Sequence, residues 1–265
     1  MNATLEQASS AASLVGKIAL ITGATSTYGI GRVSARAMAM AGAFVYVTSR
    51  DPQRGAAVVA EIEADGGKSA FLRLDVTIEE EWAAATDQVR KQFGRLDILV
   101  NNAGNLVNGP IEDMPLEDVR YMVRLNMEGP FLGMTYAWPL MKDSGGVIMD
   151  INSTGGQGGS FGSSAYGGSK GGMLGTTKAA AIDGRQYGIR AISIHPGGTW
   201  TPGMERVTGL TEEQYKRGIR EKRSIPLLRP AESADVAAAV VYFASDEARN
   251  VNGIEYNIDG GSSAG

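Results

Sequence analysis

Residues 17–31 read "KIALITGATSTYGIG": a short apolar run leads into a glycine-containing loop and then into a segment with helical spacing. Glycines between a buried strand and a helix let backbone N–H groups approach a phosphate, and the helix N-terminus adds a favourable dipole. The spacing of Gly23, Gly29 and Gly31 departs from the G-x-G-x-x-G fingerprint, and no Gly-Lys-Ser/Thr follows. Taken alone, the loop is compatible with phosphate binding and with a purely steric turn.

The same strand, loop and helix pattern continues along the chain. Apolar runs predict strands at 17–22, 43–48, 70–74, 97–101, 147–152, 190–195 and 254–258, and helical spacing separates them at 31–41, 53–65, 79–93, 116–142, 164–187 and 233–245. This alternation predicts an α/β, doubly wound Rossmann-type fold, a three-layer sandwich with about seven parallel strands. We expect a flexible N-terminal arm over 1–14, one catalytic domain over 15–265, and a substrate lid at about 203–225.

The composition restricts the possible functions. The 265 residues are 43% hydrophobic and carry a net charge of −4, which disfavours a general attraction to nucleic acid. Cysteine is absent and there is one histidine, so we expect no metal site and no thiolate chemistry. No apolar run reaches the ~18 residues of a membrane span, and the N-terminus does not read as a secretory signal. We expect a cytoplasmic protein that binds neither nucleic acid nor membrane and acts on a small molecule.

A tyrosine and a lysine stand four residues apart in "SAYGGSK", on one face of a predicted helix. A free phenol has a pKa near ~10, too high for easy proton exchange at neutral pH. A neighbouring ammonium stabilises the phenolate, so Lys170 turns Tyr166 into a usable general acid–base. Ser153 follows a predicted strand and precedes Tyr166 by thirteen residues.

These motifs together resemble the short-chain dehydrogenase/reductase family. The matching segments are the glycine loop, two residues longer than the family's T-G-x-x-x-G-x-G, then "RLDV", "NNAG" (101–104), the Ser…Tyr-x-x-x-Lys spacing, "HPGGTWTP" (195–202) and "NGIEYNIDGG" (252–261). The resemblance covers roughly residues 15–261. It implies that Ser153 holds the substrate oxygen, Tyr166 transfers the proton, Lys170 tunes Tyr166 and binds the nicotinamide ribose, and Asn126 supports a water-linked proton path.

The resemblance also implies a cofactor site. The predicted cofactor-binding residues are Gly23, Ser26, Tyr28, Gly29, Ile30, Gly31, Ser49, Arg50, Asp75, Val76, Asn102, Ala103, Gly104, Tyr166, Lys170, Pro196, Gly197, Thr199 and Thr201. The extra loop residues, Ser26 and Tyr28 among them, either bring hydroxyls to the cofactor phosphates or bulge into solvent.

The end of the second strand bears on cofactor choice. An acid there binds the ribose 2′-hydroxyl of NAD, whereas an arginine suits the 2′-phosphate of NADP. Ser49 and Arg50 occupy this place, and "Asp51-Pro52" reads as a helix N-cap followed by proline at the first helical position. We therefore expect NADP(H), with NAD(H) as the alternative.

The predicted reaction interconverts a ketone and a secondary alcohol by hydride transfer. We expect residues 105–109, 155–161 and 198–225 to line the substrate pocket, and their apolar and aromatic side chains favour a bulky hydrophobic substrate. The predicted substrate residues are Ser153, Gln157, Tyr166, Trp200 and Met204. A 3-oxoacyl thioester is the alternative substrate. The glycine-loop spacing resembles the family's divergent enoyl-thioester reductases, but these separate tyrosine and lysine more widely and lack "NNAG". Family members are commonly tetramers, so the resemblance implies a homotetramer.

Two other classes of function compete. "GGSKG" (167–171) satisfies the G-x-S-x-G motif of serine hydrolases, and Asp183 and His195 follow in the order that those enzymes use. The preceding "FGSSAYGG" is small and polar, however, whereas a nucleophile elbow needs a buried strand there. A catalytically inactive nucleotide-binding protein is the other alternative, and the presence of Ser153, Tyr166 and Lys170 argues against it.

Overall fold

The structure is a computed structural model that describes residues 12–222 and 224–264. Its centre is a parallel sheet in the order β3-β2-β1-β4-β5-β6-β7. The strands are β1 (Ile18–Ile21), β2 (Phe44–Ser49), β3 (Lys68–Arg73), β4 (Ile98–Asn101), β5 (Gly146–Ile151), β6 (Ile189–Pro196) and β7 (Glu255–Ile258). The predicted doubly wound fold with seven parallel strands is confirmed.

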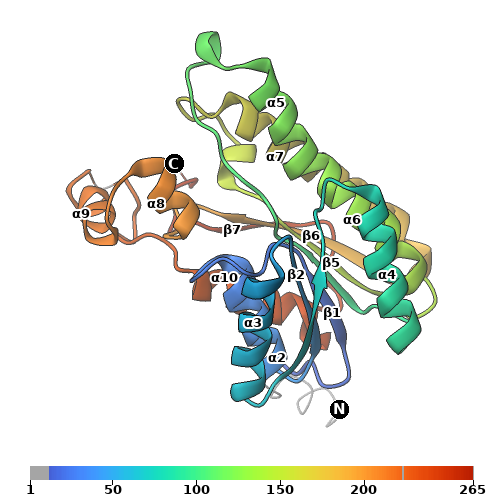
Figure 1. Ribbon diagram of the computed structural model, residues 1–265. Helices are drawn as coiled ribbons and strands as arrows, with labels where there is room; N and C mark the ends of the chain where they lie inside the picture. The colour runs from blue at the N-terminus through green and yellow to red at the C-terminus, as the bar shows by residue number, and fades with distance from the viewer. Residues whose placement is uncertain (1–11, 223, 265) are drawn as a thin grey trace, which may run out of the picture.

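Helices cover both faces of this sheet (Figure 1). One layer consists of α2 (Ile30–Met40), α3 (Pro52–Ala64) and α10 (Ser233–Ala244), and the other of α4 (Glu79–Phe93), α6 (Gly129–Met141) and α7 (Ser164–Asp183). Successive strand residues point to opposite faces. Ala19 and Ile21 of β1 therefore pack in one hydrophobic core with Met38 of α2, while Leu20 packs in the other with Trp82 of α4.

The predicted helix over 116–142 consists of three connected parts. Leu116–Val123 forms α5, Arg124–Glu128 forms a π-helical turn, and Gly129–Met141 forms α6. Short 3-10 turns occur at Ile111–Asp113, Thr154–Gly156, Gly184–Tyr187 and Asp246–Ala248. π-turns inside α-helices occur frequently at functional sites, and this one contains Asn126.

The expected lid region contains most of α8 (Pro202–Thr208) and all of α9 (Glu212–Lys222), which stand apart from the two helical layers (Figure 1). Residues 1–11 of the expected N-terminal arm lie outside the described residues. Leu14, at the arm's end, is fully buried in the core and its N–H bonds the carbonyl of Ala41. Residue 14 is therefore packed in the core, although it belongs to the expected arm.

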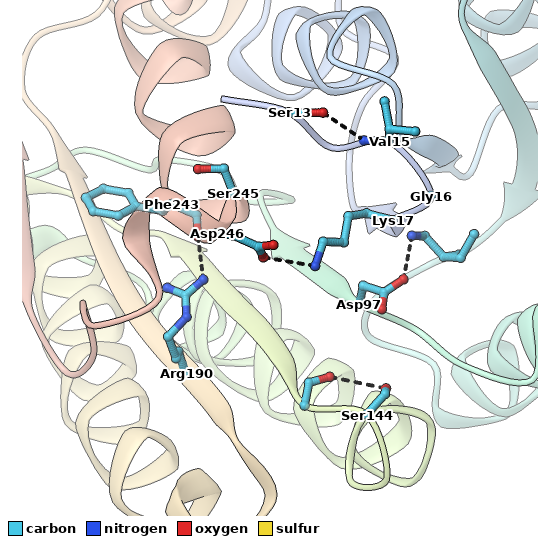
Figure 2. A network of polar contacts seen from close by, with 12 residues as sticks. Ser13, Val15, Gly16, Lys17, Asp97, Ser144, Arg190, Phe243, Ser245 and Asp246 are labelled. Atoms are coloured by element: carbon cyan, nitrogen blue, oxygen red, sulfur yellow. Dashed lines mark hydrogen bonds and ion pairs between the residues drawn. The ribbon is translucent and has the colours of Figure 1, made fainter. Parts of the chain in front are cut away.

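Polar contacts fasten the N-terminal ends of the strands, away from the carboxyl ends where ligands bind in such sheets (Figure 2). Lys17 lies 3.1 Å from the carboxylate of Asp246, and Asp97 accepts a hydrogen bond from the N–H of Ile18 at 2.7 Å. Arg190 donates to the carbonyl of Phe243 at 2.7 Å. These contacts hold the N-terminal ends of the strands in place, and the candidate functional residues lie at the opposite, carboxyl ends.

Candidate active site

A cleft with a volume of about 1160 Å³ opens at the carboxyl ends of the strands. Each of the strands β1 to β6 sends its following loop to this cleft, and α8 contributes Met204 and Val207 to its wall. The loops meet there because parallel strands all end on the same edge of the sheet.

The glycine loop after β1 is packed against the loop after β4. Gly23 adopts φ +64°, and a Cβ atom there would lie 2.8 Å from the Cα of Ala103. A Cβ atom on Gly31 would collide with the side chain of Asn102. Asn102 itself donates from Nδ2 to the carbonyls of Thr22, at 2.8 Å, and Gly23, at 3.2 Å. Only glycine permits this close packing, so these glycines have a structural reason independent of any ligand.

The longer glycine loop reaches toward the opposite wall of the cleft. Tyr28 has a φ of 37°, and its carbonyl accepts a hydrogen bond from Ser233 at 2.7 Å. Its hydroxyl donates to Oε2 of Glu205 on α8 at 2.6 Å, and this bond raises the pKa of Tyr28. The extra residues therefore connect the loop to α8 instead of bulging freely.

At the end of β2, the side chains form a small charged group. Asp51 caps α3 by accepting from the N–H groups of Gln53 and Arg54, which confirms the N-cap interpretation. Arg50 is exposed and lies 3.7 Å from the carboxylate of Asp75. Burial raises the pKa of Asp75, but hydrogen bonds from Thr77 and the charge of Arg50 outweigh it, and the pKa is lowered overall.

Tyr166, Lys170 and Ser153 all line the cleft. Tyr166 and Lys170 come from α7, and Ser153 follows β5. Burial raises the pKa of Tyr166, and a hydrogen bond with Ser153 opposes the rise. The Oγ of Ser153 also accepts from the N–H of Gly155 at 3.1 Å. The serine hydroxyl is thus next to the phenol, as a shared substrate oxygen would require.

Lys170 is almost wholly buried and donates from Nζ to the carbonyl of Ile151 at 2.8 Å. Burial lowers its pKa to about 8, and the carboxylate of Asp150 opposes this change. Asp150 was not among the predicted site residues. Its position inside a strand, "VIMDIN", carries no signal beyond a polar residue in an apolar run.

Asn126 lies fully buried in the π-helical turn. Its Nδ2 donates to the carbonyl of Asn105 at 3.0 Å and to Ser169 at 3.1 Å, and its Oδ1 accepts from the N–H of Asn105 at 3.1 Å. A Cβ atom on Gly104 would lie 3.1 Å from this Oδ1 and 3.6 Å from Nζ of Lys170. Asn126 and Lys170 therefore flank the same glycine.

Most of the predicted residues line the cleft. These are Gly23, Ser26, Gly29, Ile30, Gly31, Ser49, Arg50, Asp75, Val76, Asn102, Ala103, Gly104, Ser153, Tyr166, Lys170, Pro196, Gly197, Thr199, Thr201 and Met204.

Two predicted substrate residues are not brought to the cleft. Gln157 donates instead to Glu255, at 2.8 Å, and Asn257, at 2.9 Å, of β7. Trp200 is 8% exposed and packs on the ring of Tyr215, 5.5 Å away. Both side chains have partners elsewhere in the fold, which the sequence alone did not indicate. Arg54, which is not among the predicted residues, also lines the cleft; it lies in the first turn of α3, four residues after Arg50.

The serine hydrolase alternative does not fit this geometry. Ser169 lies inside α7 and donates to the carbonyl of Tyr166, so no strand precedes it. The ring of His195 contacts Ser193 and the carbonyl of Ser153. Ser169 is therefore a helical residue without the sharp strand-to-helix turn that a nucleophile elbow requires.

The cleft residues fit a nicotinamide dinucleotide. No side chain caps the N-terminus of α2 at Gly29, and its first turn holds no acidic residue, so its dipole favours an anion there. Arg50 and Arg54 supply positive charge farther along the cleft. Backbone donors and two cations therefore line the part of the cleft beside β1 and β2, which suits the negative phosphates of a dinucleotide, and Lys170 lies at the end of β5.

Within the described residues, no group of three or more histidine or acidic side chains is arranged to hold a metal ion. None of the helices in residues 12–222 and 224–264 combines the length and apolar character of a membrane crossing.

A family model described as enoyl-(acyl carrier protein) reductase matches residues 23–263. Trans-4-hydroxycyclohexanecarboxylate dehydrogenase of Sinomonas cyclohexanicum is 38% identical, over 94% of this chain and 93% of its own. Cyclopentanol dehydrogenase of a Comamonas strain is 36% identical, over 94% of this chain and 97% of its own. The crystal structure of a gluconate 5-dehydrogenase from Burkholderia cenocepacia with NADP and tartrate superposes with a TM-score of 0.89 at 27% identity, over 96% of this chain and 98% of the other.

Proposed function

Because the chain belongs to the short-chain dehydrogenase/reductase family and is an oxidoreductase of CH–OH groups, we propose that it uses NADP(H) to interconvert a bulky, apolar cyclic alcohol and its ketone. The observation that carries the proposal is that Tyr166, Lys170 and Ser153 line one cleft. The size and chemistry of the substrate rest on the cleft wall and on the similar proteins.

The chain's own residues account for the proton chemistry. Ser153 and Tyr166 hold the carbonyl or alcohol oxygen between two hydroxyl groups. In the reducing direction Tyr166 donates its phenolic proton to that oxygen, and in the oxidising direction its phenolate accepts the alcohol proton. Lys170 is charged below its pKa of about 8 and therefore stabilises the phenolate at neutral pH. When bound, the nicotinamide supplies or accepts the hydride.

We assign the binding of the dinucleotide to four parts of the cleft. The glycine loop and the N-terminus of α2 would hold the pyrophosphate, Asp75 and Val76 the adenine, and Lys170 the nicotinamide ribose. Ser49 and Arg50 would hold a 2′-phosphate, because the position that favours NAD when acidic carries a hydroxyl here. Arg50 is 73% exposed at its side chain, so it is free to turn toward a ligand.

The substrate proposal rests on the apolar part of the cleft. Leu106, Phe161, Met204 and Val207 line it, and the ring of Phe161 is 92% exposed. An exposed aromatic side chain that lines the same cleft as Tyr166 is available for contact with an apolar ligand. Two of the similar dehydrogenases are named for ring alcohols, which supports an alicyclic substrate.

A substrate panel tests the proposal. Purified protein is assayed with cyclopentanol, trans-4-hydroxycyclohexanecarboxylate, a hydroxysteroid, gluconate, a 3-hydroxyacyl thioester and a saturated acyl thioester, each with NADP⁺ and NAD⁺. We expect the cyclic alcohols to give the highest kcat/KM and NADP⁺ to be preferred. Highest activity on the 3-hydroxyacyl thioester would mean that the substrate is a thioester and not a cyclic alcohol. Oxidation of the saturated thioester alone would overturn the carbonyl chemistry.

A further inference from the structure

The only histidine of the chain lies beside the candidate active site but outside its cleft. His195 is the penultimate residue of β6 and has no exposed surface. Both of its ring nitrogens have partners: Nδ1 lies 2.8 Å from the carbonyl oxygen of Ser153, and Nε2 lies 2.7 Å from Oγ of Ser193. A buried ring with two short contacts is held in a single orientation.

The partners determine where the proton of this ring lies. A carbonyl oxygen only accepts hydrogen bonds, so Nδ1 must carry a proton and donate it to Ser153. In the neutral ring Nε2 is then an acceptor, and Ser193 must donate to it. Ser193 in turn accepts from Nδ2 of Asn152 at 3.1 Å. The three bonds form one directed chain from Asn152 through Ser193 and His195 to Ser153.

The buried surroundings of this ring keep it neutral near pH 7. Burial lowers the pKa of His195, and the positive charges of Lys170 and Lys178 on α7 lower it further. The hydrogen bond to Ser153 and the carboxylate of Glu255 on β7 act in the opposite direction without reversing the change. A neutral imidazole can therefore serve as a permanent donor to the Ser153 carbonyl.

The turn that carries Ser153 is tied to the neighbouring strands at two points. The carbonyl of Ser153 accepts from His195 and also from the N–H of Gly156, at 3.0 Å. Farther along the turn, Gln157 is bonded to Asn257, which is the register partner of His195 in the β6–β7 ladder. Contacts with β6 and β7 thus fix the turn, and with it the Ser153 hydroxyl.

We propose that His195 is a positioning residue, which fixes the backbone of Ser153 through its Nδ1–H bond and so keeps the serine hydroxyl aimed at the substrate oxygen. The inference rests on the proposed role of Ser153. It also connects the serine to the next segment of β6, because Pro196 and Gly197, which line the cleft, directly follow the histidine.

The first test uses the fact that the chain has one histidine. Long-range ¹H–¹⁵N spectra of uniformly labelled protein show a single imidazole without any assignment, and they report its tautomer and its titration. We expect the Nδ1–H tautomer at pH 7 and a pKa below the ordinary 6.5. An Nε2–H tautomer or a charged ring at pH 7 would overturn the proposal, whether or not the protein turns over any substrate.

The second test compares two amide substitutions. The amide nitrogen of asparagine can replace Nδ1, whereas that of glutamine replaces Nε2 and leaves the carbonyl of Ser153 without its donor. His195→Gln should therefore speed hydrogen exchange at residues 153–157 and lower kcat for cyclopentanol about tenfold or more, since small misplacements of reacting groups are costly. His195→Asn should stay within about threefold of the original kcat and retain slow exchange.

Ser193→Ala separates positioning from general destabilisation. It removes the partner of Nε2 and leaves the bond to Ser153, so it should lower the melting temperature with little change in kcat. Equal kcat and exchange in His195→Gln and the original protein would refute the proposal. If His195→Gln does not fold, a loss of kcat in Ser193→Ala as large as in His195→Ala would also refute it. If no substrate is found, the tautomer and the exchange data still decide.

Discussion

Nζ of Lys170 donates to the carbonyl of Ile151 at 2.8 Å, one residue beyond a fully buried carboxylate, that of Asp150. Asp150 accepts from Asn101 at 2.9 Å and from Thr177 at 2.6 Å. The buried strand end therefore holds an ammonium and a carboxylate that each affect the other's pKa. Neither group is solvated, so changes at either should be measurable as changes in pH dependence.

Asp150 makes the stability of the fold depend on pH. Burial raises its pKa from 3.8 to about 6. Because the folded pKa lies above the unfolded one, this group's contribution to the free energy of unfolding is greatest below about pH 3.8 and is lost as the pH rises through about 6. The free energy of unfolding of Asp150→Asn, measured with urea from pH 4 to 7, should not show that loss. The asparagine fits, since Thr177 can donate to Met173 instead, at 2.9 Å. The same loss in the variant would contradict this assignment.

Lys170 should control the ionisation of Tyr166. Lys170→Met removes a buried positive charge, and a charge of this kind shifts a neighbouring pKa by about 1–3 units. We expect kcat/KM for alcohol oxidation at pH 7 to fall about ten- to a thousandfold, with the pH profile displaced upward. Lys178→Met, on the same helix but paired with Glu255, is the matched control and should keep the original profile. An unshifted profile with uniformly lower activity would contradict the electrostatic role.

Arg50 should distinguish the two cofactors. Arg50→Ala removes the charge proposed to bind the 2′-phosphate, and bonds to charged groups commonly change affinity about ten- to a hundredfold. We therefore expect kcat/KM for NADP⁺ to fall by that factor and kcat/KM for NAD⁺ to change less than about threefold. Steady-state assays with both cofactors provide the comparison within one variant. Equal losses for both would show that Arg50 does not read the 2′-phosphate.

The hydrogen bond between Tyr28 and Glu205 should slow cofactor release. Tyr28→Phe removes the donor that connects the glycine loop to α8, and we expect NADPH to dissociate about two- to tenfold faster. Stopped-flow fluorescence measures this rate without turnover. Tyr242→Phe on α10, a tyrosine of nearly equal exposure, is the control. An unchanged rate would mean that the bond does not restrain α8.

The sequence predicted the fold well because its signals are local. β1 is apolar along its whole length and β4 over its first three residues, and Asp51-Pro52 marks the start of α3 through chemistry within three residues. The Tyr166–Lys170 spacing likewise depends on one helix. These features can be recognised without knowing what packs against them.

The features that the sequence did not reveal depend on distant partners. Gln157 and Trp200 have the residue types expected for a pocket, but contacts with β7 and Tyr215 turn them away. The bond between Tyr28 and Glu205 spans 177 residues, and the role of His195 depends on Ser193 and Ser153 meeting around one ring. The role of Asp150 could not be recognised from the sequence. A single acidic residue in an apolar strand looks like a tolerated polar substitution until its hydrogen-bond partners are known.

The most direct test of the central claim is the rate of NADP⁺ reduction by a cyclic secondary alcohol in Tyr166→Phe. The phenylalanine preserves the ring and removes only the group that exchanges the proton. We predict that kcat falls about a hundred- to ten-thousandfold, while NADPH binding, followed by fluorescence, stays within about threefold of the original protein because the glycine loop and Arg50 are untouched. Turnover that survives the substitution with the original pH profile would contradict the account.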